Sequence, residues 1–279
     1  MTKGKEMTKM KKILLILIVF VLSVSMIGCQ KTTSGDNNEI KVGVSFFPMK
    51  DILLLVEDDL KEDGYSLKIE EFSDYQTPNN LLKNEELDAN MIQHDYFLQS
   101  FNKSNDANLV TIQPLYHATF ALYSKDYKTL EEIPNGASIT VPDDATNLSR
   151  ALHLLGQAGL ITFKDNKTIG LAVEDIESNH KDLKFNDQVP LTSLAQKYTE
   201  TGLAIMYPTY AKSLELVGDE QRLYVEKQDD VTEGYAISLV SRNDNKDSEK
   251  IKTLIKHITS DKVKQFLIDQ YSWASSPAF

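Results

Sequence analysis

Cysteine is almost absent from this chain, because Cys29 is the only one among 279 residues. A single thiol cannot form an internal disulfide. Its position is also unusual, since it directly follows a long apolar run near the N-terminus. Cys29 is therefore expected to belong to an N-terminal signal and not to act as a catalytic nucleophile.

Catalytic and metal-binding motifs are missing as well. The sequence has no G-x-S-x-G elbow, no G-x-x-x-x-G-K-[ST] loop and no H-E-x-x-H motif. The five histidines are scattered without an H-x-H or C-x-x-C pattern, whereas zinc requires several convergent ligands. We therefore expect neither an enzyme nor a metal or cofactor site.

Positive charge is scarce, since 30 Lys and Arg face 41 Asp and Glu for a net charge of −11. Residues 1–28 carry five Lys and one Glu, a net of +4, so the chain without them would carry −15. Such acidity argues against nucleic acid, which needs basic clusters, and against a polybasic contact with anionic lipid. A small molecule or another protein is the expected partner.

The N-terminus carries a basic segment followed by an uncharged apolar run over 13–28. This order is typical of a secretory signal peptide, and the run is shorter than the roughly 20 residues of a membrane-spanning helix. Gly28-Cys29 then resembles the lipobox of bacterial lipoproteins, although Met26 stands where Leu is more usual. The resemblance implies that Cys29 is lipidated and becomes the first residue of a protein anchored at the cell membrane, outside the cytoplasm. The polar residues up to 38 are then a flexible tether.

Beyond residue 39, apolar alternation and helical periodicity follow each other along the chain. This order predicts an α/β protein with a mostly parallel sheet. Strands are expected at 40–46, 65–72, 87–92, 109–115, 117–124, 138–142, 203–207 and 234–242. Helices are expected at 51–64, 77–88, 94–103, 147–159, 248–258 and 261–271. Two such bodies joined by long strands would leave a ligand cleft between them.

Arg150 stands out because it falls in the first turn of a helix, where the helix dipole favours anions over cations. A guanidinium beside free backbone N–H groups makes an anion site, to which Asn147 could add hydrogen bonds. The alternative is an ion pair between Arg150 and Asp143 or Asp144.

Aromatic and polarisable residues gather in two other segments. Tyr75 follows a strand, and Met91, His94 and Phe97 lie close together in the chain. A pocket with such walls suits an apolar or thioether side chain, whereas the alternative is ordinary core packing.

The segments FSDYQTPNNLLKNEELDANMIQHDYFLQSFN and LYSKDYKTLEEIPNGASITVPDDATNLSRALHLLGQAGLITF, with the closing PAF, resemble the NlpA-type lipoproteins. That family comprises methionine-binding proteins of bacterial ABC importers. The resemblance implies a type II periplasmic-binding-protein fold, with two α/β lobes, a ligand cleft between them and two crossing strands near 115–121 and 232–240. The expected lobes are 39–117 with 236–279, and 118–235.

The resemblance also implies roles for individual residues. Arg150 and Asn147 would hold the ligand carboxylate, and Tyr75 and His94 would belong to the site. The full set of predicted ligand-binding residues is Tyr75, Met91, His94, Phe97, His117, Asn147, Arg150 and Tyr207.

Three segments depart from the family pattern. Tyr207 replaces the first Asn of I-N-G-N-Y, Ile237 replaces an Asn of the second crossing strand, and Met91-Ile92 replaces an aromatic residue. A phenol only partly restores the donors and acceptors of a lost carboxamide. These changes leave open a different amino acid or a short peptide as the ligand.

The sequence therefore predicts a monomeric, lipid-anchored substrate-binding protein that delivers an amino acid, methionine by resemblance, to an ABC permease with its ATPase. A surface adhesion or interaction lipoprotein with a degenerate pocket is the alternative from another class.

Overall fold

The computed structural model describes residues 38–218 and 221–279. The predicted signal peptide, Cys29 and the tether up to residue 37 lie outside the described residues. Within the described part, no helix is long and apolar enough to cross a membrane.

A six-stranded sheet forms the first lobe, with the strand order β13-β4-β12-β3-β1-β2. Its strands are β1 (Glu39–Val44), β2 (Ser66–Glu71), β3 (Ala89–Gln93), β4 (Leu109–Ala118), β12 (Ile237–Arg242) and β13 (Ser275–Pro277). β1 pairs in parallel with β2 and β3, whereas the pairs β12–β3, β12–β4 and β13–β4 are antiparallel. The prediction of a mostly parallel sheet is therefore wrong, because β12 runs opposite to its neighbours β3 and β4, and β13 runs opposite to β4.

Helices cover this sheet and bury its apolar residues. They are α2 (Met49–Leu55), α3 (Glu57–Glu62), α4 (Thr77–Lys83), α5 (Asp95–Asn105), α9 (Glu249–Ile258) and α10 (Asp261–Tyr271). Ile40 and Val42 of β1 share one hydrophobic cluster with Leu254 of α9 and Leu267 of α10. The C-terminal helices thus pack against the sheet of the first lobe, the lobe to which the resemblance assigned them. The single helix predicted over 51–64 is two helices, because the backbone at Val56 leaves the helical region.

The second lobe is built around a three-stranded sheet with the order β10-β5-β11. It consists of β5 (Ala121–Ser124), β10 (Leu203–Met206) and β11 (Arg222–Val225). β10 and β11 each pair with β5 in the antiparallel direction. Shorter strand pairs join β6 (Val141–Pro142) to β9 (Gln188–Val189) and β7 (Ile161–Phe163) to β8 (Ile176–Asn179). Its helices are α6 (Ala145–Gln157), α7 (Leu194–Thr201) and α8 (Pro208–Lys212), and short 3-10 turns are η1 (Lys164–Asn166), η2 (Val173–Asp175), η3 (Leu191–Ser193) and η4 (Thr232–Tyr235).

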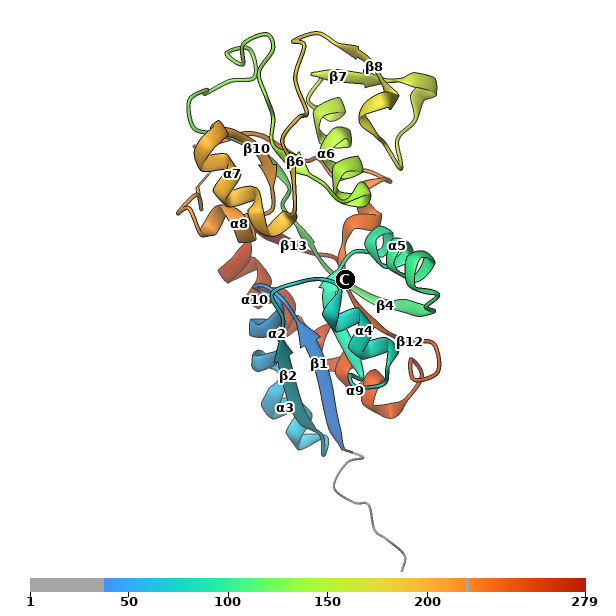
Figure 1. Ribbon diagram of the computed structural model, residues 1–279. Helices are drawn as coiled ribbons and strands as arrows, with labels where there is room; N and C mark the ends of the chain where they lie inside the picture. The colour runs from blue at the N-terminus through green and yellow to red at the C-terminus, as the bar shows by residue number, and fades with distance from the viewer. Residues whose placement is uncertain (1–37, 219–220) are drawn as a thin grey trace, which may run out of the picture. The chain divides into compact units, whose positions relative to one another are not determined.

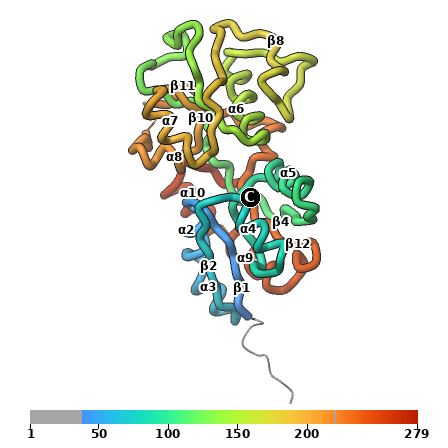
Figure 2. The backbone as a smooth tube through the Cα atoms, viewed as in Figure 1, coloured from blue at the N-terminus to red at the C-terminus, as the bar shows by residue number. Residues whose placement is uncertain are grey.

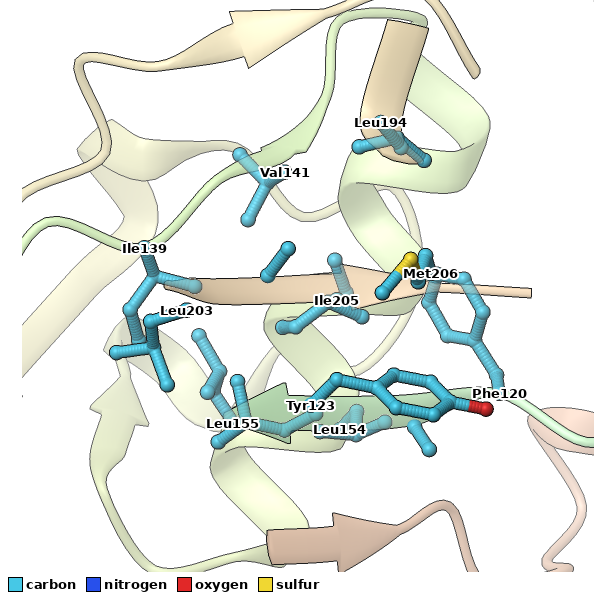
Figure 3. Packing of buried hydrophobic residues seen from close by; sticks show 14 of the residues in the cluster. Phe120, Tyr123, Ile139, Val141, Leu154, Leu155, Leu194, Leu203, Ile205 and Met206 are labelled. Atoms are coloured by element: carbon cyan, nitrogen blue, oxygen red, sulfur yellow. The ribbon is translucent and has the colours of Figure 1, made fainter. Parts of the chain in front are cut away.

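A separate hydrophobic cluster fills this second lobe. Side chains of β5 and β10 pack with Leu154 and Leu155 of α6 and Leu194 of α7, as Figure 3 shows. α6 buries every residue from Asn147 to Leu155. This deep burial fixes the helix that carries Asn147 and Arg150.

Two short connections join the lobes (Figures 1 and 2). The chain leaves β4 at Ala118 and enters β5 at Ala121, and it returns from β11 through η4 to β12. The single strand predicted over 117–124 is therefore two strands that belong to different sheets. Residues Glu39–Phe279 nevertheless form one compact unit. The exact lobe limits given above stay a prediction.

Candidate ligand-binding site

A pocket of about 580 Å³, counting its part open to solvent, lies between the two sheets. The first lobe lines it with Tyr75, His94 and Phe97, and the second lobe lines it with Asn147 and Tyr207. Each of these residues stands just beyond a strand or at the start of a helix. This is where ligands bind in α/β folds, beyond the strand ends.

Local structure fixes three of the polar residues that line the pocket. His94 is the N-cap of α5, where its side chain accepts a hydrogen bond from the backbone of Phe97. Asn147 lies in the first turn of α6, and Tyr207 is the N-cap of α8, with Pro208 at the next position. Proline is favoured in the first helical turn, so the chain must turn into α8 directly after Tyr207.

Arg150 is fully buried and forms an ion pair with Glu226, the residue after β11. Its Nε donates to one carboxylate oxygen over 2.8 Å, and its Nη2 donates to the other over 2.5 Å. Nη2 also donates to the carbonyl of Ala118 over 3.1 Å, and Nη1 donates to the phenol of Tyr207 over 3.0 Å. Burial opposes the charge of the guanidinium, but the neighbouring carboxylate keeps the pKa of Arg150 above its usual value.

Aromatic rings enclose the same guanidinium. Its central carbon lies 4.9 Å from the ring centre of Phe120, 5.2 Å from that of Tyr207 and 4.8 Å from that of Tyr235. Such contacts add to the attraction of a desolvated cation for its surroundings. Arg150 is therefore held from several sides and is not among the residues that line the pocket.

The alternative prediction, an ion pair of Arg150 with Asp143 or Asp144, is wrong, because the partner is Glu226. Asp144 instead caps α6, since its side chain accepts a hydrogen bond from the backbone N–H of Asn147 over 2.9 Å. The same carboxylate accepts from the Asn147 amide over 3.1 and 3.0 Å. Asp144 thus holds the donor end of the Asn147 side chain away from the pocket.

A chain of hydrogen bonds continues from Arg150 to the first lobe. Tyr207 donates to Oδ1 of Asn147 over 2.6 Å, and Nε2 of His94 lies 3.3 Å from the same oxygen. Nδ1 of His94 accepts from the N–H of Phe97 over 3.1 Å, so the ring proton must sit on Nε2 and point at Asn147. Burial, with the nearby charge of Arg150, lowers the pKa of His94 to about 3, so this imidazole is neutral at physiological pH.

Aromatic side chains form another wall of the pocket. The hydroxyls of Tyr75 and Tyr210 lie 2.8 Å apart and connect the two lobes. The ring of Tyr75 lies 5.4 Å from that of Phe46 and 5.9 Å from that of Phe97. Burial raises the pKa of both phenols, so the hydroxyl pair is uncharged. An aromatic wall of this kind favours an apolar or thioether ligand.

Three of the predicted residues do not line this pocket. Met91 is fully buried in the hydrophobic cluster of the first lobe, and His117 lies on β4 opposite Ser276 of β13. Arg150 does not line the pocket either, but it is hydrogen-bonded to Tyr207, which does. Tyr75, His94, Phe97, Asn147 and Tyr207 do line it, and ligand contact by all eight residues stays a prediction.

The described residues that line the pocket carry no formal charge, since His94 is neutral and the others have no ionised group. Within the described part, no cluster of three or more His, Cys, Asp or Glu could hold a metal ion. Geometry and lining together fit reversible binding of a small, partly apolar molecule.

A family model described as NlpA lipoprotein matches residues 40–279. This chain belongs to the NlpA lipoprotein family. Among its relatives is the "Methionine-binding lipoprotein MetQ" of Bacillus subtilis, which is 33% identical over 96% of this chain and 99% of the relative. The "D-methionine-binding lipoprotein MetQ" of Escherichia coli K12 is also 33% identical, over 86% of this chain and 88% of its own.

Solved structures of NlpA relatives share the fold. A nutrient-binding protein of Burkholderia cenocepacia, solved with methionine bound, has a TM-score of 0.79 at 31% identity and covers 86% of this chain and all of its own. The fold is thus the periplasmic-binding-protein fold that the resemblance implied, and NlpA proteins act as substrate-binding components of ABC importers.

Sequence reasoning missed several residues of this NlpA site. Glu226 is the most important, because it balances the charge of Arg150. A buried arginine needs an acidic partner, but the sequence offers 41 Asp and Glu and no spacing that selects one. Two aromatic residues were also missed, because their contacts with Tyr75 join segments that are separated in the chain. Phe46 lines the pocket beside Tyr75, and Tyr210 is hydrogen-bonded to Tyr75.

Proposed function

We propose that this protein captures methionine outside the cytoplasm and delivers it to an ABC permease and its ATPase. The observation that carries the proposal is the aromatic-walled, uncharged pocket with a polar end at His94, Asn147 and Tyr207. A pocket of this kind suits a thioether side chain. The identities to methionine-binding relatives support the same ligand.

Binding is the whole activity in this proposal, and no covalent chemistry is involved. Phe97 and Tyr75 would enclose the thioether, and the polar end would hold the amino-acid head group. Met91 would support this wall from the core of the first lobe. His117 would contribute to ligand binding from β4, the strand that leads into the first crossing. The ligand would contact both lobes and therefore favour the closed arrangement, which the permease would then recognise.

The membrane anchor is part of the proposal. Cys29 would carry the lipid, and the acidic, monomeric folded part would extend from the outer side of the cell membrane. Two acyl chains anchor a protein stably where one anchors it only marginally. Replacing Cys29 by Ala should move the protein from the membrane to the soluble fraction, and an unchanged membrane fraction would contradict lipidation at this residue.

Isothermal titration calorimetry with L-methionine tests the proposal. The full-length lipoprotein in detergent should bind L-methionine more tightly than the other common amino acids. Arg150→Ala should bind it far more weakly, since it removes the cation that supports the polar end. Equal and tight binding by both proteins would contradict the role given to Arg150, and no preference for methionine would contradict the ligand.

A different amino acid or a short peptide is the second candidate ligand. The observation in its favour is that Glu226 balances the charge of Arg150, while Tyr207 stands between this cation and the pocket. Mass spectrometry of the molecule released from purified protein separates the two candidates.

A further inference from the structure

The polar end of the pocket is unusual for a site that binds a free carboxylate. The nearest cation is Arg150, but its ion pair with Glu226 makes the two side chains neutral together. Its hydrogen bonds to residues that line the pocket run from Nη1 to the phenol of Tyr207 and from Nη2 to the carbonyl of Ala118. A carboxylate therefore meets no uncompensated positive charge among the described residues that line this pocket.

Tyr207 fills the place between the two groups that would hold an anion. Its hydroxyl accepts from Arg150 over 3.0 Å and donates to Oδ1 of Asn147 over 2.6 Å. The Asn147 amide cannot turn its N–H groups towards the pocket without losing both contacts to Asp144. The groups around the phenol oxygen thus match a hydroxyl, which can both accept and donate, and not a carboxylate, which can only accept.

We propose that Tyr207 sets the ligand's carboxyl selectivity, because its hydroxyl occupies the position that a free α-carboxylate needs beside Arg150. With the phenol in place, the site discriminates little between an amino acid and a derivative whose carboxyl group is neutral, such as an amide. A free carboxylate binds well only when it displaces this hydroxyl. This inference rests on the proposed capture of methionine, and it names the residue that controls recognition of the head group.

The experiment compares two probes, L-methionine and L-methioninamide, on the full-length lipoprotein in detergent by calorimetry. These probes share the thioether and the amine and differ in the charge of the carboxyl group. The measured quantity is the ratio of the Kd for the amide to the Kd for the free amino acid. A ratio taken within one protein is insensitive to a general loss of active material.

Tyr207→Phe removes the hydroxyl and keeps the ring. It should raise the ratio at least about tenfold, since a hydrogen bond to a charged group becomes available to the free carboxylate. Tyr198→Phe is the matched control, because Tyr198 is a buried tyrosine of the same hydrophobic cluster that lies away from the pocket. Its ratio should equal that of the unaltered protein. Thermal unfolding of all three proteins establishes that each is folded.

Each outcome decides the question. A raised ratio in Tyr207→Phe alone supports the inference. If the unaltered protein binds neither probe while Tyr207→Phe binds L-methionine at least about tenfold more tightly than L-methioninamide, the proposed function fails and the role of Tyr207 stands. An unchanged or lowered ratio overturns the inference, and tight methionine binding by the unaltered protein then leaves the proposed function intact. If Tyr207→Phe is folded but binds neither probe, the inference is overturned, and methionine binding by the unaltered protein alone decides the proposed function.

Discussion

Arg150 and Glu226 place opposite charges where neither side chain is exposed. Removing two charges from water costs several kcal/mol for each ion, and the two-point contact with the extra hydrogen bonds offsets much of that cost. Rings of Phe120, Tyr207 and Tyr235 exclude water around the pair. The pair is therefore a fixed part of the site, and each of its members depends on the other.

This dependence gives a prediction for stability. Arg150→Met should lower the free energy of unfolding by about 3–5 kcal/mol, because it leaves the Glu226 carboxylate buried without a partner. The double variant Arg150→Met/Glu226→Leu should recover most of that loss, since it removes both charges. Urea unfolding followed by circular dichroism measures both values. A double variant no more stable than Arg150→Met would contradict the account.

His94 gives a prediction for pH. Its pKa of about 3 in the folded protein lies below the usual value near 6.5, so the unfolded chain binds more protons between these values. The stability due to neutral His94 is thus complete above about pH 6.5 and is lost as the pH falls towards 3. His94→Asn keeps an N-cap acceptor and removes the titration, so its melting temperature should fall less steeply between pH 6.5 and 4. An identical pH profile for the two proteins would rule out His94 as the source.

Several of these residues were predictable from the sequence, and their partners were not. Tyr75, His94, Phe97, Asn147 and Tyr207 were identified from aromatic clusters, from a helix start and from the comparison with the NlpA pattern. They line one pocket, and ligand contact by them stays a prediction. Glu226 is separated from Arg150 by 76 positions. A pairing of that separation depends on how β11 lies beside β5, which local sequence pattern does not determine.

At the scale of single elements, α6 does most to position the site. Asp144 caps this helix and also holds the amide of Asn147. The helix then buries its side chains in the core of the second lobe, so its start cannot shift relative to the sheet.

Replacing the cap should therefore affect both stability and binding. Asp144→Ala should cost about 1 kcal/mol of stability and weaken ligand binding, because Asn147 loses the carboxylate that orients its amide. Asp144→Ser should retain most of the stability, since serine is a good N-cap, but not the binding. Chemical denaturation and calorimetry measure the two effects. A serine variant that loses as much stability as the alanine variant would contradict the capping role.

Element prediction succeeded where the apolar pattern was regular and failed at the breaks. The alternation of Ile40, Val42 and Val44 indicated β1 correctly. The continuous pattern over 117–124 concealed the break at 119–120, because both halves are apolar although they pair in different sheets. The helical pattern over 51–64 likewise concealed the break at Val56, because it continues through both helices.

At the scale of the whole molecule, contacts between the lobes surround the pocket. Tyr75 meets Tyr210 through their hydroxyls, and His94 meets Asn147. The wall near Phe97 is aromatic, and the polar end is neutral. A ligand with a thioether body and a small polar head satisfies both ends at once, which is the physical basis for the proposed capture of methionine.

The most direct measurement is the identity of the molecule that leaves the purified protein on denaturation, determined by mass spectrometry. The account predicts methionine, at close to one molecule per chain when the protein has been equilibrated with an equimolar mixture of amino acids. Recovery of another amino acid or a peptide in its place, or of nothing from a folded protein, would contradict it.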